Sequence, residues 1–189
     1  MAKYKMRRPE TLEEVMNRYN PSGDFGACGK QFEVLFRATL TDRVERAHPA
    51  GYADCVVKRG VVVECKTGAG TLGDFGWDTK EEAELAMENM DFLHKCSHVA
   101  YLPKFNGYNL EDTIIVPRKR FIRILLKYNL VRVRCGSNGK WYVTIQNYLP
   151  TEKFKPSRER VGCLIEDLQD NGYYLDIFAK RMLNKELEL

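Results

Sequence analysis

The chain between residues 52 and 66 reads Tyr52-Ala-Asp-Cys-Val-Val-Lys58, Arg59-Gly60 and Val61-Val-Val-Glu-Cys-Lys66. Two apolar runs on either side of a glycine are typical of two strands joined by a turn, and runs that are apolar on both faces indicate a sheet covered on both sides. Side chains two apart on a strand share a face, so Glu64 and Lys66 should point the same way and Cys65 the other. Charges in such a buried run are costly unless they are paired or bind a metal. This hairpin is therefore the first place to look for a functional site.

The charged residues of the hairpin suit metal-assisted hydrolysis of a phosphodiester. Asp54 and Glu64, together with the backbone carbonyl of Cys65, would offer the hard oxygen ligands that Mg²⁺ prefers. Lys66 could then orient or help to deprotonate a metal-bound water, or neutralise charge that grows on the phosphate. A structural ion pair of Lys66 with either Glu64 or Asp54 explains the same residues, and the spacing alone leaves both interpretations open.

The length of the hairpin connection decides whether Asp54 can join the site. A two-residue turn would set Asp54 opposite Cys65, on the wrong face of the strand pair. A three-residue connection or a bulge would set it on the face of Glu64 and Lys66. The proposed site therefore requires an odd connection.

The segment before the hairpin is predicted to be an amphipathic helix. Apolar residues recur with helical spacing at Phe32, Leu35, Phe36 and Leu40. Glu33 falls on the edge of this apolar stripe, from which its carboxylate could reach the acids of the hairpin. An ion pair with Arg37, one helical turn later, is the alternative.

This succession of elements resembles the PD-(D/E)XK nuclease superfamily, most closely the archaeal-type Holliday junction resolvases. The resemblance covers roughly residues 26–103 and rests on Gly29-Lys30-x-x-Glu33 in a helix, a short strand around residues 43–48, Ala53-Asp54, and Val63-Glu64-Cys65-Lys66-Thr67. It implies an α/β fold with a restriction-endonuclease-like αβββαβ core, in which a mixed central sheet is flanked by helices. It also implies cleavage of DNA that depends on Mg²⁺ or Mn²⁺.

The resemblance also assigns roles to single residues. Asp54 and Glu64 would be metal ligands with the Cys65 carbonyl, Lys66 the catalytic lysine, and Glu33 a helix-borne acid that could also contact the metal. The loop before Asp54 reads His48-Pro-Ala-Gly-Tyr52, which differs from the serine-bearing loop that such resolvases often carry. The resemblance therefore implies DNA as the substrate, but this departure leaves specificity for branched junctions open.

A glycine-rich segment, Gly68-Ala-Gly-Thr-Leu-Gly73, follows the hairpin. It fits the G-x-G-x-x-G pattern of dinucleotide sites, but no helix signal follows it directly, which disfavours that interpretation. We expect it to be either a mobile flap over substrate or an ordinary exposed loop. Downstream, Thr79-x-x-Glu82 is a capping box that predicts a helix, and a strand is expected over residues 98–102.

The next region is strongly basic. A strand at 113–116, a helix at 118–128 and a hairpin at 131–145 are predicted, and seven Lys or Arg but no acid lie between Arg118 and Arg134. Basic residues near a cleavage site would bind phosphates without reading sequence; a solvated helix and hairpin face is the alternative. Trp141 and Tyr142 are expected in the core rather than as stacking platforms. The candidate phosphate ligands are Arg118, Lys119, Arg120, Arg123, Arg132, Arg134 and Lys140.

Composition bounds the remaining questions. The chain has 189 residues, a net charge of +4, 44% hydrophobic and 30% charged residues, and six cysteines without metal-ligand spacing. These values are typical of a soluble globular protein with one core and with mostly buried thiols in a reducing cytoplasm. No signal peptide or membrane-spanning run is evident.

We expect an N-terminal helical arm over residues 1–23, a nuclease-like core over 24–116, and a C-terminal helix-hairpin-helix extension over 117–189. The extension should end in a helix capped by Ser157 and a final helix that includes Tyr174, and these helices could cover the core or form a homodimer face. Two rival functions remain: a catalytically silent nucleic-acid-binding protein on the same fold, and a purely structural or protein-binding module.

Overall fold

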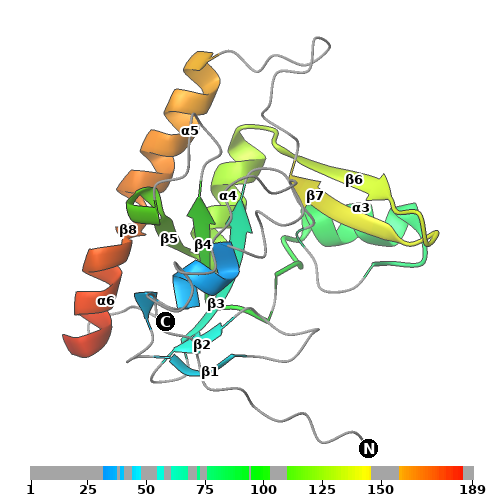
Figure 1. Cartoon of the computed structure of the whole chain (residues 1–189). Helices are drawn as coiled ribbons and strands as arrows, with labels where there is room; N and C mark the ends of the chain where they lie inside the picture. The colour runs from blue at the N-terminus through cyan, green and yellow to red at the C-terminus, as the bar shows by residue number, and fades with distance from the viewer. Residues whose placement is uncertain are drawn as a thin grey trace, which may run out of the picture.

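A mixed β-sheet runs through the centre of the protein (Figure 1). The computed structural model describes residues 32–37, 39–40, 44–47, 55–57, 61–67, 72, 76–93, 95–102, 110–145 and 158–184. Within these ranges the sheet has the strand order β1-β2-β3-β4-β5-β8, with β3 and β4 parallel and the other neighbours antiparallel. The strands are β1 (Val44–Ala47), β2 (Cys55–Val57), β3 (Val62–Thr67), β4 (His98–Leu102), β5 (Ile114–Pro117) and β8 (Tyr173–Tyr174).

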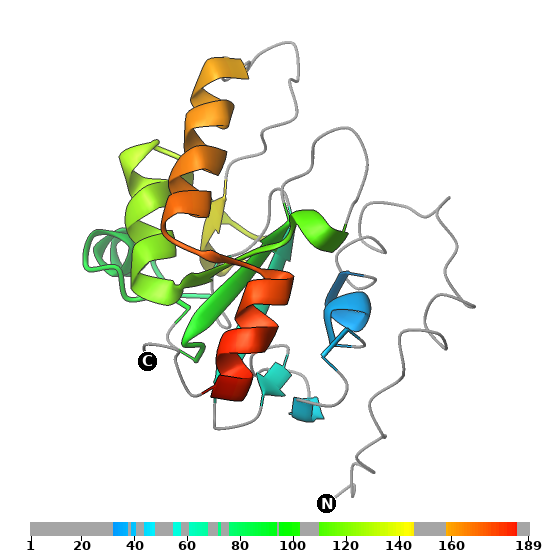
Figure 2. The same cartoon turned by 90° about the vertical axis from the view of Figure 1, so that its left-hand side faces the viewer.

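Helices cover both faces of this sheet, so the fold class is α/β. Figure 2 shows the sheet between α4 on one side and the helical residues 32–37 on the other. A second sheet, formed by β6 and β7, projects as a hairpin next to α3 (Figure 1). The remaining elements are α3 (Lys80–Glu88), η2 (Leu110–Asp112), α4 (Arg118–Lys127), β6 (Val131–Cys135), β7 (Trp141–Ile145), α5 (Arg158–Asp170) and α6 (Leu175–Asn184).

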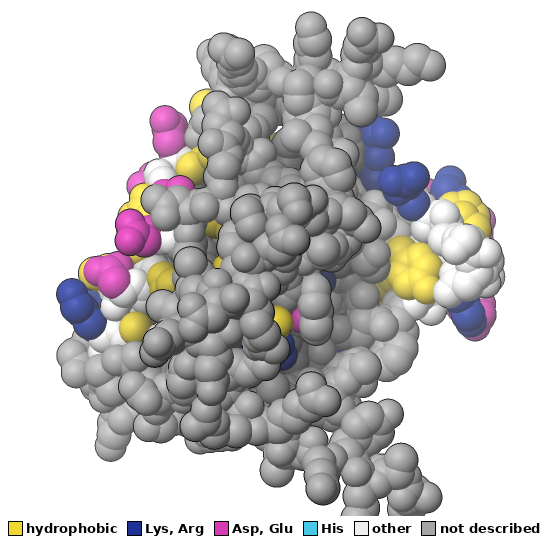
Figure 3. Space-filling view, in the orientation of Figure 1, with side chains coloured by type: hydrophobic (Ala, Val, Ile, Leu, Met, Phe, Trp, Pro, Cys, Tyr) yellow, Lys and Arg dark blue, Asp and Glu magenta, His cyan; other side chains and the backbone are white. Residues whose placement is uncertain are grey.

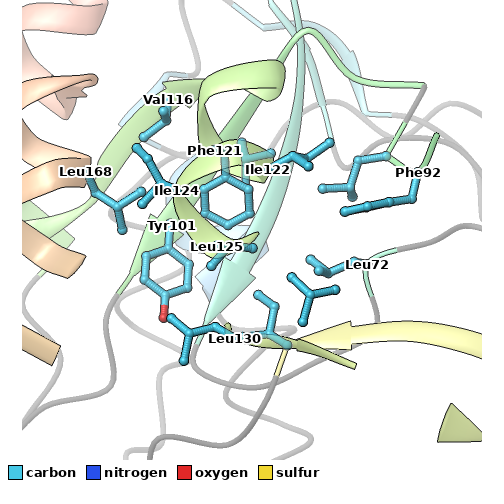
Figure 4. Close-up of a cluster of buried hydrophobic side chains, with 14 of the residues drawn as sticks. Leu72, Phe92, Tyr101, Val116, Phe121, Ile122, Ile124, Leu125, Leu130 and Leu168 are labelled. Carbon is cyan, nitrogen blue, oxygen red and sulfur yellow. The ribbon is translucent and has the colours of Figure 1, made fainter. Parts of the chain in front are cut away.

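The first core lies on the α4 side of the sheet. Alternate residues of β4 and β5 point into it, and side chains of α4, α5 and the hairpin close it (Figure 4). Fully burying one such side chain contributes about 1.5–3 kcal/mol. The central members are Leu72, Phe92, Val99, Tyr101, Ile114, Val116, Phe121, Ile122, Leu125, Leu130, Val143, Leu164 and Leu168.

The second core lies on the opposite face. It is lined by Val63, Cys65, Ala100 and Ile115, the residues that alternate with those of the first core along β3, β4 and β5. Two segments far apart in the chain cover it, because Phe32, Phe36 and Leu40 of the first helical segment and Leu175 and Phe178 of α6 all belong to this cluster. The near-continuous apolar strands predicted from the sequence are thus buried on both faces.

Local sequence signals explain where two of the helices begin. Thr79 caps α3: its hydroxyl accepts from the backbone N–H of Glu82, and the Glu82 carboxylate accepts from the N–H of Thr79. Pro117 directly precedes α4, where a residue without an N–H costs the helix no hydrogen bond. Both starts agree with the sequence prediction.

Some expectations need correction. Tyr174 lies in β8, paired with Ile114, and not in the final helix, which begins at Leu175. Thiols are not mostly buried in the described part of the chain, since Cys135 and Cys163 are exposed while Cys65 and Cys96 are buried. The predicted arm over residues 1–23 and the capping residue Ser157 lie outside the described residues.

Candidate functional site

Strand β3 presents Glu64 and Lys66 on one face of the sheet. Val63 and Cys65 point into the second core, and in the parallel pairing Glu64 lies beside Val99 and Lys66 beside Tyr101, both members of the first core. Glu64 and Lys66 therefore lie on the first-core side, with Cys65 on the other, as strand periodicity predicts.

The two charges form a close pair in a shielded position. The Nζ atom of Lys66 donates to Oε1 of Glu64 across 2.6 Å. Glu64 is 8% exposed, and the Lys66 side chain is 19% exposed. A carboxylate with so little access to water needs a compensating partner, and Lys66 provides one. The pair is compatible both with a structural role and with a site in which a cation or a phosphate competes for the same groups.

The register between β2 and β3 bears directly on Asp54. Cys55 pairs with Val63 and Val56 with Val62, which corresponds to a connection with an odd number of residues. This is the register that the proposed site requires. Asp54 itself lies outside the described residues, one position before β2.

The helical segment 32–37 approaches the sheet from the other side. Its Phe32 and Phe36 pack in the second core, whereas Glu64 faces the first-core side. Glu33 is half-buried on this segment. Glu33 therefore lies on the helical segment that covers the second-core face of the sheet, whereas the Glu64 side chain points to the other face. The spacing of the helix could not reveal this difference.

The glycine-rich segment after β3 is anchored where the structure describes it. Leu72 is fully buried in the first core, and its backbone N–H donates to the carbonyl of Val143 at 2.7 Å. Farther on, Trp77 and Trp141 exchange two backbone hydrogen bonds of 2.8 and 2.9 Å. The expectation of an exposed loop is therefore wrong at Leu72, whose side chain is buried and whose backbone is bonded to β7. The other residues of Gly68–Gly73 lie outside the described part of the chain.

The predicted phosphate ligands fall on two surfaces. Lys119, Arg120 and Arg123 are exposed on α4, and Arg132 and Arg134 are exposed on β6. Arg118 is different, because it is half-buried and its Nη1 atom lies 3.5 Å from the carbonyl oxygen of Phe92. Figure 3 shows Lys and Arg side chains (dark blue) next to hydrophobic ones (yellow) over the hairpin at the right of the molecule.

Two lysines of the basic region are held by acids. Lys140 makes an ion pair with Asp78, and this hydrogen bond raises the pKa of Lys140. Lys127 makes one with Asp167 across 2.6 Å, which raises the pKa of Lys127 in the same way. Lys140 would therefore have to leave Asp78 before it could bind a phosphate, and this ion pair joins distant parts of the chain.

Tyr142 is a candidate that the sequence reasoning placed in the core. It is half-buried and pairs across the hairpin with Arg134, so it shares the face of the exposed arginines. Trp141 lies on the other face of β7, opposite Cys135. The alternation of side chains along a strand could have shown that Tyr142 and Trp141 lie on opposite faces of β7, and that Tyr142 shares its face with Arg134.

Only part of the predicted metal site falls within the described residues, because Glu64 and Cys65 are described and Asp54 is not. Within them, no three side chains of His, Cys, Asp or Glu gather in one place.

Comparisons with protein-family models, with curated proteins and with solved structures gave no match. Among the described helices, none is both long enough and apolar enough to cross a membrane.

Proposed function

We propose that the protein is a metal-dependent DNA endonuclease of the PD-(D/E)XK type. The observation that carries this proposal is the shielded Glu64–Lys66 pair on β3, next to a strand whose register would continue with Asp54 opposite Glu64. One further step of the Cys55–Val63 pairing joins these two residues, and it would bring both carboxylates to one face.

The order of the elements supports the same proposal. The helical segment 32–37 is followed by β1, β2 and β3, which pair antiparallel in sequence, then by α3 and by β4 parallel to β3. This is the αβββαβ order that the resemblance implies. This support is independent of the sequence motif, because the order comes from pairings between strands and the motif from short stretches of sequence.

The residues present suit a hard divalent cation. Asp54, Glu64 and the Cys65 carbonyl would hold Mg²⁺ or Mn²⁺, which supplies a Lewis acid and an activated water when bound. Lys66 would leave Glu64 and donate to the phosphate as its negative charge grows. Close contact with Glu64 keeps the Lys66 ammonium at the site before substrate arrives, so it would exchange one oxygen partner for another without a long movement.

The exposed arginines support a polyanionic substrate. Arg132 and Arg134 on β6 and Arg123 on α4 would contact phosphates, which positions DNA without specifying its sequence. Lys119 and Arg120 would extend this surface along α4. We expect cleavage and binding to weaken with rising salt, because each phosphate contact releases condensed counterions.

The test is a cleavage assay on linear, flapped and four-way junction DNA with Mg²⁺ or Mn²⁺. Asp54→Asn should impair both calorimetric Mg²⁺ binding and cleavage. Lys66→Ala should keep metal and DNA binding but cut roughly 10²–10³ times more slowly, the usual effect of such groups. Glu111→Gln, at an exposed acid outside the sheet, is the matched control and should behave as wild type.

A catalytically silent nucleic-acid-binding protein is the second candidate, and the basic surfaces of α4 and the hairpin favour it. It predicts DNA binding without metal, no heat of Mg²⁺ binding and no cleavage of any substrate. Full cleavage by Lys66→Ala would exclude the lysine from the mechanism. Unfolding of both Asp54→Asn and Lys66→Ala, seen by circular dichroism, would favour a structural ion pair, whose disruption costs about 3–5 kcal/mol.

A further inference from the structure

The β6–β7 hairpin has two chemically different faces. Val131, Val133, Val143 and Ile145 point toward the first core, where they pack as buried or partly buried members. The outer face carries the alternate residues, with Arg132 paired to Thr144 and Arg134 paired to Tyr142. This outer face, defined by Arg132, Arg134, Tyr142 and Thr144, is called the hairpin platform below.

The ring of Tyr142 is held in a fixed place on the platform. It lies between two glycines, since a Cβ atom at Gly76 would be 2.8 Å from its Cζ and one at Gly136 would be 2.8 Å from its Cε2. The amide of Asn138 donates to the Tyr142 hydroxyl at 2.8 Å. The ring is thus supported along its edges by backbone without side chains, and the half-buried residue keeps part of its surface in solvent.

We propose that the hairpin platform binds single-stranded DNA, with a base stacked on Tyr142 and phosphates bound by Arg132 and Arg134. Stacking on an aromatic ring, flanked by cations for the backbone, is how proteins bind single strands without sequence preference. A duplex cannot use the ring in this way, because its bases are already stacked on each other. Seven Lys or Arg and no acid lie over residues 118–134, which favours a polyanion over an apolar partner. The ring of Tyr142 beside Arg134 favours a single strand with unstacked bases over an acidic protein.

This inference shares Arg132 and Arg134 with the DNA-binding surface of the proposed nuclease and rests on that function to this extent. It goes beyond that function in the contact of Tyr142 with a single strand, which needs neither Glu64, Lys66 nor a metal. The alternative is that Tyr142 only covers the two glycines and stabilises the hairpin. That role predicts a loss of stability on substitution, but no preference between single and double strands.

The decisive experiment measures fluorescence anisotropy of a labelled oligo-dT and of a mixed-sequence duplex of equal length, both in EDTA. Tyr142→Ala should weaken binding of the single strand by about 5-fold to about 150-fold, the change expected for one stacked base, and change duplex binding little. Tyr142→Leu keeps apolar cover over the glycines but lacks a ring, so it should show the same selective loss. Tyr174→Ala, at an exposed tyrosine of β8, is the matched control and should leave both affinities unchanged.

The salt dependence tests the arginine contact separately. Arg134→Ala should reduce the slope of log K against log salt for oligo-dT by about 0.7, the value for one phosphate of a single strand. Lys180→Ala removes the same charge from α6 and should leave the slope unchanged. An unchanged slope for Arg134→Ala would remove this residue from the site.

A second measurement keeps the test valid if the variants fold poorly. Wild-type protein should photo-crosslink to an oligonucleotide containing 5-iodouracil, with the modified peptide mapping to Tyr142. A crosslink that maps elsewhere, or equal losses for single strand and duplex in Tyr142→Leu, would overturn the proposal. Because these assays omit metal and compare a single strand with a duplex, their outcome does not depend on the cleavage and Mg²⁺-binding tests of the nuclease proposal.

Discussion

Protonation of His98 should destabilise the protein strongly between pH 7 and pH 4. His98 is 1% exposed, and its ring packs edge-on against Phe178 in the second core. The hydroxyl of Ser97 donates to the carbonyl of Val62 at 3.0 Å, so its single proton is already used. The Nδ1–H of His98 must then donate to Ser97 Oγ, 3.0 Å away, which leaves Nε2 as a bare lone pair without a hydrogen-bond partner.

The magnitude follows from this environment. A proton on Nε2 would place a charge in an apolar core with nothing to accept its hydrogen bond, and burial lowers the pKa of His98 from 6.5 to about 4. The unfolded chain therefore binds the proton more tightly than the folded protein. Stability from this group is complete above about pH 6.5 and falls as the pH drops toward 4, with a loss of about 2 kcal/mol between pH 7 and pH 5 and about 3 kcal/mol by pH 4.

Urea unfolding of wild type and His98→Asn over this pH range provides the assay. Asparagine can still donate to Ser97 but does not titrate, and the cost of the space it leaves does not change with pH. The difference in unfolding free energy between wild type and His98→Asn should thus shrink as the pH falls. The titration of carboxylates affects both proteins equally and cancels from this difference. Parallel pH profiles would refute the reasoning and show that the folded protein accommodates the charged imidazole.

Three further predictions concern the packing around the hairpin and α5. Leu72→Ala should lower the free energy of unfolding in urea by about 2–5 kcal/mol, because Leu72 is fully buried. Leu85→Ala, at a residue 57% exposed, is the control, and equal losses in the two variants would contradict the anchoring of Leu72. Gly76→Ala should lower the melting temperature, because its Cβ would lie 2.5 Å from the Cβ of Lys140; an unchanged melting temperature would mean that the hairpin moves aside. Asp167→Asn should lower the pKa of Tyr128 toward its ordinary value, because the hydrogen bond to Asp167 raises it; an ultraviolet difference titration identical to that of wild type would argue against this contact.

Elements with strong local signals could be predicted from the sequence. Three signals involve only residues close together in the chain, so they could be recognised without knowledge of tertiary contacts. They are the capping box at Thr79, the Pro117 start of α4 and the glycine turn of the β6–β7 hairpin. The placement of Glu64 and Lys66 on one face followed from strand periodicity alone. The sequence was therefore sufficient to predict these elements of the α/β fold and the placement of Glu64 and Lys66 in the candidate site.

Features that depend on distant contacts could not be predicted. Leu72 is anchored through Val143, and Lys140 is held by Asp78, partners separated along the chain by much more than a helical turn. Tyr174 belongs to a two-residue strand that exists because β5 offers a free edge, although its local pattern favours a helix. The helical stripe of Phe32 and Phe36 was recognised, but a stripe does not specify which face of a sheet it will cover.

The second core, which Phe32 and Phe36 cover from one segment and Phe178 from another, also has a consequence for synthesis. Its two covers come from opposite ends of the described chain, so a ribosome releases the first long before it makes α6. During that interval Val63, Cys65 and Ile115 lack the part of their cover that α6 provides. Contacts between residues so far apart in the chain also form slowly. The nascent chain should therefore depend on α6 to complete folding, and we expect it to be most vulnerable to aggregation and proteolysis until that helix emerges.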